Sequence, residues 1–211
     1  MSTLRSFISA TVRGLLIGAA FIAPISSFGV EQFKESSSGT SFDKSTAFTH
    51  NGKTFKLDAT GAALRRKWFV KGYVIGHYIE NPVIGTQEEV LEDIFSNAKA
   101  KQITKIWLHQ LPLSLIRESY KETLQKVMTA SEYEKNQADI NRFAKFFKED
   151  AEVGDVHYLR WLPGGYVELY KNEEQRGSLV NAELAKALWS MWLGPESVVD
   201  RKKLIALTST D

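Results

Sequence analysis

A buried β-strand is indicated by one stretch of the sequence, Arg65-Arg-Lys-Trp-Phe-Val-Lys-Gly-Tyr-Val-Ile-Gly-His-Tyr-Ile-Glu80. After three basic residues, the stretch is apolar and aromatic, and it is rich in β-branched side chains. This composition is typical of a pleated strand that is covered for most of its length. We therefore predict one long central strand over residues 65–80.

The two faces of this predicted strand differ in chemistry. Because side chains alternate between the faces of a strand, Lys71, Tyr73 and His77 fall on one face and Gly72 and Gly76 on the other. Glycines inside a strand indicate a place where another element comes close. We expect the first face, with its amine, phenol and imidazole, to line a ligand cleft.

Further strands are indicated by alternating apolar residues and by turn dipeptides. Asn51-Gly52 lies between two alternating segments, which is typical of a β-hairpin. Residues 58–63, with Gly61, are expected to form a turn that leads into the central strand. The other expected strands cover residues 103–111, 156–161 and 166–170, with an edge strand at 177–180.

Helices are indicated by apolar residues at helical spacing and by capping signals. The expected helices are one over residues 86–100, one carrying Ile116, Tyr120, Leu124 and Val127, one starting at a capping box in 131–134, one from Asn181 to Gly194, and a short one within 198–207. Strands and helices are grouped rather than alternating. This grouping predicts the α+β class, with a mostly antiparallel sheet covered on one face by helices.

Composition narrows the classes of protein and of site. The chain has 211 residues, 43% hydrophobic and 25% charged, and a net charge of +2, which fits one domain and gives no basic footprint for nucleic acid. Without cysteine it has no disulfide, zinc-thiolate site or thiol nucleophile. Its four histidines lack metal-ligand spacing, and it has no Gly-x-Ser-x-Gly elbow or phosphate loop. We expect neither metal nor cofactor.

The N-terminus has the layout of a secretory signal peptide over residues 1–29. Arg5 and Arg13 precede an apolar run of about twelve residues, and Ser27-Phe28-Gly29 offers small residues for a signal peptidase. The run is shorter than the roughly 20 residues that span a bilayer, so retention as an anchor is the lesser alternative. We predict cleavage near Val30, a periplasmic or secreted protein, a flexible linker over residues 30–45 and a folded domain over 46–211.

Two segments resemble the chalcone isomerase-like family. Residues 61–80 are similar to the family's glycine-containing turn, arginine and long strand that ends in Gly-x-Tyr-Leu-Glu, and residues 181–194 to its last long helix and Trp-Leu-Gly end. The resemblance covers roughly residues 45–207. It implies a large sheet, a helical layer and a ligand cleft between them.

The resemblance also implies which residues form the site. In the plant isomerases, an arginine before the strand holds the substrate's phenolate, and a threonine in the strand supports the developing enolate. Arg65 matches the arginine, but Tyr73 occupies the threonine position and Met191 a hydroxyl-bearing position on the last helix. The family's two polar residues on the helix after the next strand fall near Ile116 and Thr123.

Non-catalytic members of the family bind fatty acids through an arginine and a tyrosine, and Arg65 with Tyr73 resembles that pair. Our first hypothesis is an exported protein that binds a small hydrophobic carboxylate or similar amphiphile through Arg65, Tyr73, Lys71 and Met191, without chemistry. The second is an isomerase or intramolecular lyase that acts on a phenolic or enone substrate and uses Arg65. The third is a structural, partner-binding protein with a filled cleft.

Overall fold

The computed structural model describes residues 31–67 and 69–211. The predicted signal peptide, residues 1–29, lies outside the described residues. Within those that are described, no helix has both the length and the apolar character needed to cross a membrane.

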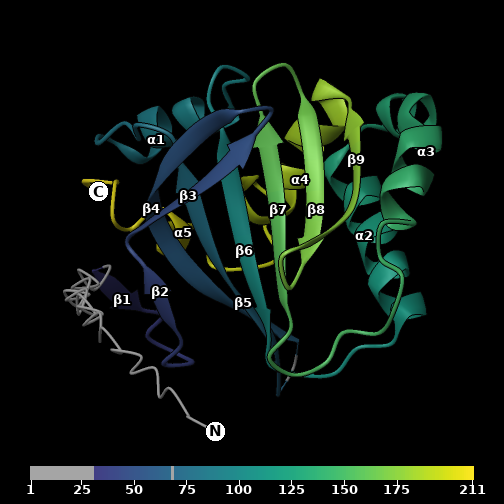
Figure 1. Cartoon of the computed structure of the whole chain (residues 1–211), viewed down its shortest axis with the longest axis horizontal. Coiled ribbons are helices and arrows are strands. Elements are labelled where there is room, and N and C mark those ends of the chain that lie inside the picture. Colours follow the sequence, from purple (N-terminus) through teal and green to yellow (C-terminus); the bar gives the residue numbers. More distant parts are fainter. Residues whose placement is uncertain (1–30, 68) are drawn as a thin grey trace, which may run out of the picture.

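The domain is built on a seven-stranded antiparallel sheet in which each strand pairs with the next one along the chain. The strands are β3 (Ser45–His50), β4 (Lys53–Lys67), β5 (Val70–Ile79), β6 (Lys101–Trp107), β7 (Val156–Leu162), β8 (Tyr166–Lys171) and β9 (Glu174–Val180). Figure 1 shows that the sheet is strongly curled. The predicted edge strand is confirmed, because β9 ends the sheet.

The helices pack against one face of this sheet; in Figure 1, α4 and α5 lie behind the strands, and α2 and α3 lie to their right. They are α1 (Gln87–Phe95), α2 (Leu113–Val127), α3 (Ala130–Ala144), α4 (Ala182–Leu193) and the short α5 (Arg201–Leu204). The main core lies between these helices and the sheet, and includes Ile75, Ile79, Ile103, Ile116, Leu124, Phe143, Leu188 and Trp192. The predicted α+β class, with helices covering one face of an antiparallel sheet, is confirmed.

The prediction of one strand over residues 65–80 is wrong. The chain reverses there, because β4 ends at Lys67 and β5 starts at Val70 in a hairpin. Phe69, between the two strands, is 99% exposed. The apolar residues of this segment continue across the reversal, so its composition did not indicate a turn. The basic side chains on either side of the turn fit a hairpin tip that is exposed to solvent.

The turn expected at residues 58–63 is also wrong, because this segment lies inside β4. The register with β5 shifts between Ala59 and Gly61, so the strand carries a bulge there. A Cβ atom at Gly61 would collide with the backbone carbonyl oxygen of Lys203. The glycine therefore admits the backbone of α5 onto the sheet, which is the reason for its presence in a strand.

A hairpin lies within the described part of residues 30–45, where a flexible linker was predicted. β1 (Gln32–Lys34) pairs with β2 (Ser41–Asp43), and the serine-rich turn between them is ordered by Glu35, whose carboxylate accepts hydrogen bonds from Ser38. Phe42 is only 4% exposed, because its ring lies where a Cβ of Gly76 would be. The folded domain thus includes this hairpin.

Local signals predicted most of the remaining element boundaries. The Asn51-Gly52 hairpin is confirmed, with positive φ at both residues, and Asn181 caps α4 as expected. Helix α1 starts at the predicted capping box but ends five residues earlier than expected, at Phe95. The capping box of α3 is Thr129 with Glu132, two residues before the expected one. Both candidate boxes have the same spacing, so spacing alone did not separate them.

Candidate functional site

A pocket of about 890 Å³ lies between the sheet and helices α2 and α4. Its walls come from the ends of β4, β5 and β6, from one face of α2, and from α4 with the segment that follows it. Its volume is within the range of small-molecule sites, roughly 300–1,000 Å³. Of the residues predicted from the sequence, Arg65, Tyr73, Met191 and Thr123 line this pocket.

Arg65 and Tyr73 are brought together by the β4–β5 hairpin, in which they are directly paired. The Arg65 guanidinium is half-buried, and its Nη1 donates a hydrogen bond of 2.8 Å to the carbonyl oxygen of Val198. The Tyr73 hydroxyl accepts a hydrogen bond of 3.0 Å from Nε1 of Trp192. Arg65 therefore holds the segment after α4 against the sheet, whereas Tyr73 points into the pocket.

Two residues of the expected cleft face lie elsewhere. The register between β4 and β5 shifts at Gly72, so Lys71 turns to the opposite side of the sheet, where its Nζ donates 3.1 Å to the carbonyl oxygen of Ser37. His77 is fully buried in the core. Ile116, near an expected helix position, is likewise a core residue and does not line the pocket.

His77 belongs to a complete chain of hydrogen bonds behind the pocket. Its Nε2 accepts 3.0 Å from Nε1 of Trp189, so Nδ1 carries the hydrogen and donates 2.8 Å to the hydroxyl of Thr60. That hydroxyl donates 2.6 Å to the carbonyl oxygen of Leu204. Burial, and secondarily the charge of Lys101, lowers the pKa of His77 to about 3, so this imidazole is neutral and structural.

Lys105 on β6 is the main residue of the pocket that the sequence analysis missed. It is 3% exposed, and its Nζ donates 2.8 Å to the hydroxyl of Tyr120 on α2. The rings around this nitrogen have centroids at 4.4 Å (Tyr73), 4.7 Å (Tyr120), 5.0 Å (Trp107) and 5.2 Å (Trp192). Among the described residues it forms no ion pair with a carboxylate.

The aromatic surroundings change the protonation of Lys105. Burial lowers the pKa of this amine to about 7, because the charged form loses its hydration. The rings partly replace the lost water through cation–π attraction. Both the ammonium and the neutral amine are thus populated near neutral pH.

Among residues 31–67 and 69–211, the two phenols beside Lys105 have no acceptor for their hydroxyl hydrogens. The Tyr73 hydroxyl accepts from Trp192 and the Tyr120 hydroxyl accepts from Lys105, so each keeps its own hydrogen for a further partner. Burial raises the pKa of Tyr73 and that of Tyr120, so both remain protonated. An ammonium and two hydroxyl donors therefore converge on one end of the pocket, as a carboxylate or another oxyanion requires.

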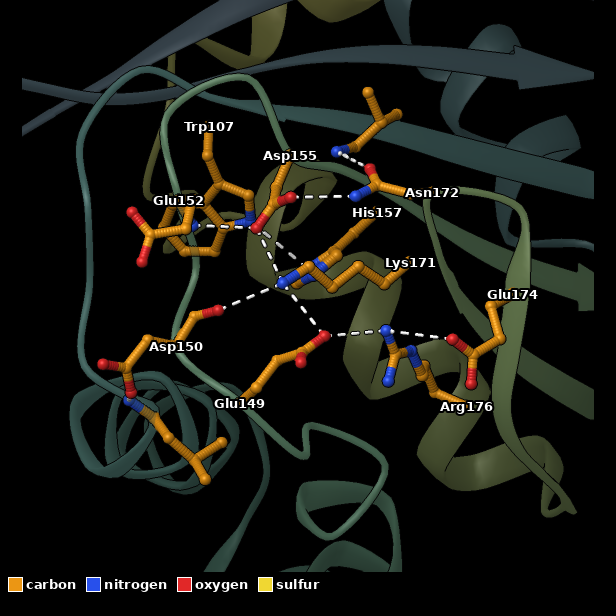
Figure 2. A network of polar contacts seen from close by, with 12 residues as sticks. Trp107, Glu149, Asp150, Glu152, Asp155, His157, Lys171, Asn172, Glu174 and Arg176 are labelled. Atoms are coloured by element: carbon orange, nitrogen blue, oxygen red, sulfur yellow. Dashed lines mark hydrogen bonds and ion pairs between the residues drawn. The ribbon is translucent and has the colours of Figure 1, made fainter.

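A network of polar contacts orients the indole of Trp107, which forms one wall of the Lys105 site (Figure 2). The Trp107 indole Nε1 donates 3.3 Å to Nδ1 of His157, whose pKa is lowered to about 3 by burial and then by the charges of Lys105 and Lys171. Lys171 in turn pairs with Asp155 at 2.7 Å. Figure 2 shows Lys171 and Arg176 bridged by Glu149. These contacts hold His157 as a neutral acceptor and thereby orient the indole.

A periodic signal for the missed residues exists in the sequence. Lys105 alternates in phase with Ile103 and Trp107, which face the core, and Tyr120 lies between Ile116 and Leu124 on the buried stripe of α2. A lysine is rarely fully buried unless a partner group satisfies its charge. The aromatic rings that enclose it come from distant elements, and only the fold brings them together.

Comparison with known proteins agrees with this architecture. The structure is similar to the crystal structure of a fatty-acid binding protein of Arabidopsis thaliana, with a TM-score of 0.67, 16% sequence identity, and coverage of 83% of this chain and 96% of that chain. A search of curated proteins found no match. The family model described as chalcone isomerase-like matches residues 34–204. Since this match spans most of the sequence, the chain belongs to the chalcone isomerase-like family.

Proposed function

We propose that the protein binds a fatty-acid-like amphiphile, with the carboxylate at Lys105 and the acyl chain along the apolar walls of the pocket. The observation that carries this proposal is the buried Lys105 amine, which forms no ion pair with a carboxylate in the described part of the chain. A bound carboxylate would supply the missing counter-charge and would accept hydrogen bonds from Tyr73 and Tyr120. The fatty-acid binding protein with a similar fold supports the same class of ligand.

Arg65 has a secondary part in this proposal. Its Nη1 donates to the Val198 carbonyl oxygen. The guanidinium therefore adds positive potential beside Tyr73, but not all of its N–H donors are available to a ligand. The carboxylate was expected at Arg65 with Tyr73, and the geometry favours a position deeper in the pocket, between Tyr73, Lys105 and Tyr120.

The acyl chain has to supply much of the binding free energy. A hydrogen bond to a charged group nets about 1.5–3 kcal/mol, whereas association costs roughly 4–15 kcal/mol. Each buried methylene contributes about 0.8 kcal/mol. Apolar surface for it is available at Val70, Leu115, Met191 and Val198. Affinity should therefore rise with chain length until the pocket is full.

Calorimetric titration of C6 to C16 fatty acids tests this function. Affinity should rise with chain length, and Lys105→Met should weaken every acid by at least about tenfold, equivalent to about 1.4 kcal/mol. Tyr73→Phe and Arg65→Ala should weaken binding less. Lys71→Ala is the matched control, since that lysine points away from the pocket. Affinity that does not depend on chain length, or that Lys105→Met leaves unchanged, would refute the proposal.

We also propose that the protein works outside the cytoplasm, after removal of residues 1–29. The support is the basic, apolar and small-residue pattern of that segment. N-terminal sequencing of protein from a fractionated exporting host should give a first residue at or near Val30 in the extracytoplasmic fraction. Intact Met1 in the membrane fraction would indicate an anchor instead.

A further inference from the structure

The chemistry of Lys105 goes beyond that of an anion anchor. Its side chain lines the pocket, and its nitrogen has one hydrogen-bond partner in the described part of the chain, Tyr120, and is otherwise faced by rings. The titratable groups packed against it are Tyr73 from β5, Tyr120 from α2 and His157 from β7, all neutral near pH 7. Arg65 of β4, which is paired with Tyr73, adds a positive charge nearby. In its neutral form, this amine has a lone pair, and its side chain lines a space large enough for a ligand.

Lys101, four residues earlier on the same strand, shows that burial alone does not create such a site. Its side chain is also fully buried, and burial lowers its pKa to about 8. Its Nζ donates to the carbonyl oxygens of Ser96 and Lys99 and lies 3.9 Å from the ring centroid of Trp161. Its amine hydrogens are therefore engaged. Because Lys101 does not line the pocket, its amine also has no space beside it for a reactant.

We propose that Lys105 captures aldehydes covalently, as a reversible imine between its Nζ and the carbonyl carbon of an aliphatic aldehyde whose chain lies in the pocket. The proposal requires the pocket and the amine, but not affinity for fatty acids. It therefore adds a second ligand class, the aldehyde, to the carboxylate of the proposed function.

The reaction needs no oxidant, reductant or metal. The lone pair of Nζ attacks the carbonyl carbon, a C–N bond forms, and the C=O π electrons move to oxygen. A proton passes from nitrogen to that oxygen to give a carbinolamine. The Tyr120 hydroxyl, at 2.8 Å from Nζ, is placed to donate a proton to the departing hydroxyl. Water leaves, the C=N bond forms, and Tyr120 recovers its proton from the imine nitrogen or from solvent.

The lowered pKa of Lys105 makes the capture selective. With a pKa of about 7, roughly half of this amine is neutral at pH 7. An ordinary lysine with a pKa near 10.4 has about one neutral amine in a few thousand. Because only the neutral amine attacks a carbonyl, Lys105 should react well ahead of exposed lysines, even after allowance for its lower intrinsic nucleophilicity.

Reductive trapping tests the proposal on the intact protein. Octanal is added at about one equivalent at pH 7 with sodium cyanoborohydride, which reduces an imine to a stable secondary amine, and the modified peptide is located by mass spectrometry. Alkylation should occur at Lys105 on the order of tenfold or more faster than at any exposed lysine, and Lys101 should remain unmodified. Alkylation spread over surface lysines, with no preference for Lys105, would overturn the proposal.

Two variants separate chemistry from simple access. Tyr120→Phe should slow trapping at Lys105 severalfold while the trapped site stays the same, because the proton donor is lost and the amine remains. Lys105→Met should abolish selective trapping, and its far-ultraviolet circular dichroism reports whether it folds. Selective alkylation that persists at another lysine in Lys105→Met would contradict the assignment.

The outcome is distinguishable from that of the proposed function. Fatty-acid binding without trapping at Lys105 would leave the carboxylate site standing and remove the imine. Trapping at Lys105 without measurable fatty-acid binding would support the imine and remove the carboxylate proposal.

Discussion

At the scale of single residues, burial in the pocket destabilises the charged form of Lys105. A buried ammonium without a carboxylate partner is less stable than the same group in water, and the lowered pKa of about 7 expresses that cost. Ligand sites commonly contain such perturbed groups, because the ligand relieves the strain that the fold maintains. The four rings and Tyr120 reduce the cost without removing it.

This cost predicts a pH dependence of stability for the protein without ligand. Because the folded pKa of Lys105 is about 7 and the unfolded value is near 10.4, the unfolded chain binds more protons between these two values. Stability should therefore rise with pH in that window and fall as pH decreases toward 7, by up to about 1.4 kcal/mol per pH unit.

Urea unfolding at pH 7 and pH 9 measures the effect. The wild-type protein should gain more stability over this interval than Lys105→Met, by about 1–2 kcal/mol, since the variant lacks the titrating amine. Lys101 titrates in both proteins, so the difference isolates Lys105. Equal gains in the two proteins would show that the amine is not perturbed as described.

At the scale of elements, the β4–β5 hairpin brings Arg65 opposite Tyr73, and Gly61 admits α5 to the sheet. Local signals sufficed where two or four residues define a structure, as at Asn51-Gly52 or Thr86 with Glu89. They failed at residues 58–70. There Gly61 makes room for a distant backbone, and the chain reverses between Lys67 and Val70 without the residues that usually indicate a turn. A glycine that a turn requires and one that a neighbouring backbone requires look the same in a single sequence.

Substitution at Gly61 tests the contact with α5. Gly61→Ala should destabilise the protein by about 2 kcal/mol or more, because the new methyl group collides with the Lys203 carbonyl, which cannot move without shifting α5. Gly72→Ala is the matched control on the next strand. A Cβ there would meet only the Arg65 carbonyl oxygen, at 3.7 Å, so its free energy of unfolding should change by less than about 0.5 kcal/mol. Equal effects would contradict a role in packing.

At the scale of the whole molecule, the fold class was predictable because the grouping of strands and helices, together with the resemblance at residues 61–80 and 181–194, indicates one architecture. The pocket was predictable only in part. Tyr73, Arg65 and Met191 could be named from the resemblance, whereas Lys105 and Tyr120 become neighbours only when α2 packs across the sheet. Lys71 was misplaced because one bulge reverses the alternation of side chains.

The assembled pocket also bears on catalysis. We expect no meaningful acceleration of chalcone cyclisation, because the tyrosine ring of Tyr73 fills space where the plant isomerases have a threonine, and Met191 offers no hydroxyl for the substrate. Steady-state absorbance assays over a panel of chalcones should give rates equal to those of buffer. Saturable turnover that is lost in Arg65→Ala would make the isomerase hypothesis the primary one.

The contacts between β4 and the C-terminal segment mean that one wall of the pocket is the last part of it to be synthesised. The Thr60 hydroxyl binds the carbonyl of Leu204, 144 positions later, and Arg65 binds that of Val198. Chains emerge from the ribosome N-terminus first, so the sheet and α2 are available while this last wall of the pocket is still missing. The pocket is consequently closed on this side only after the segment from Val198 to Leu204 has been synthesised and has packed against β4.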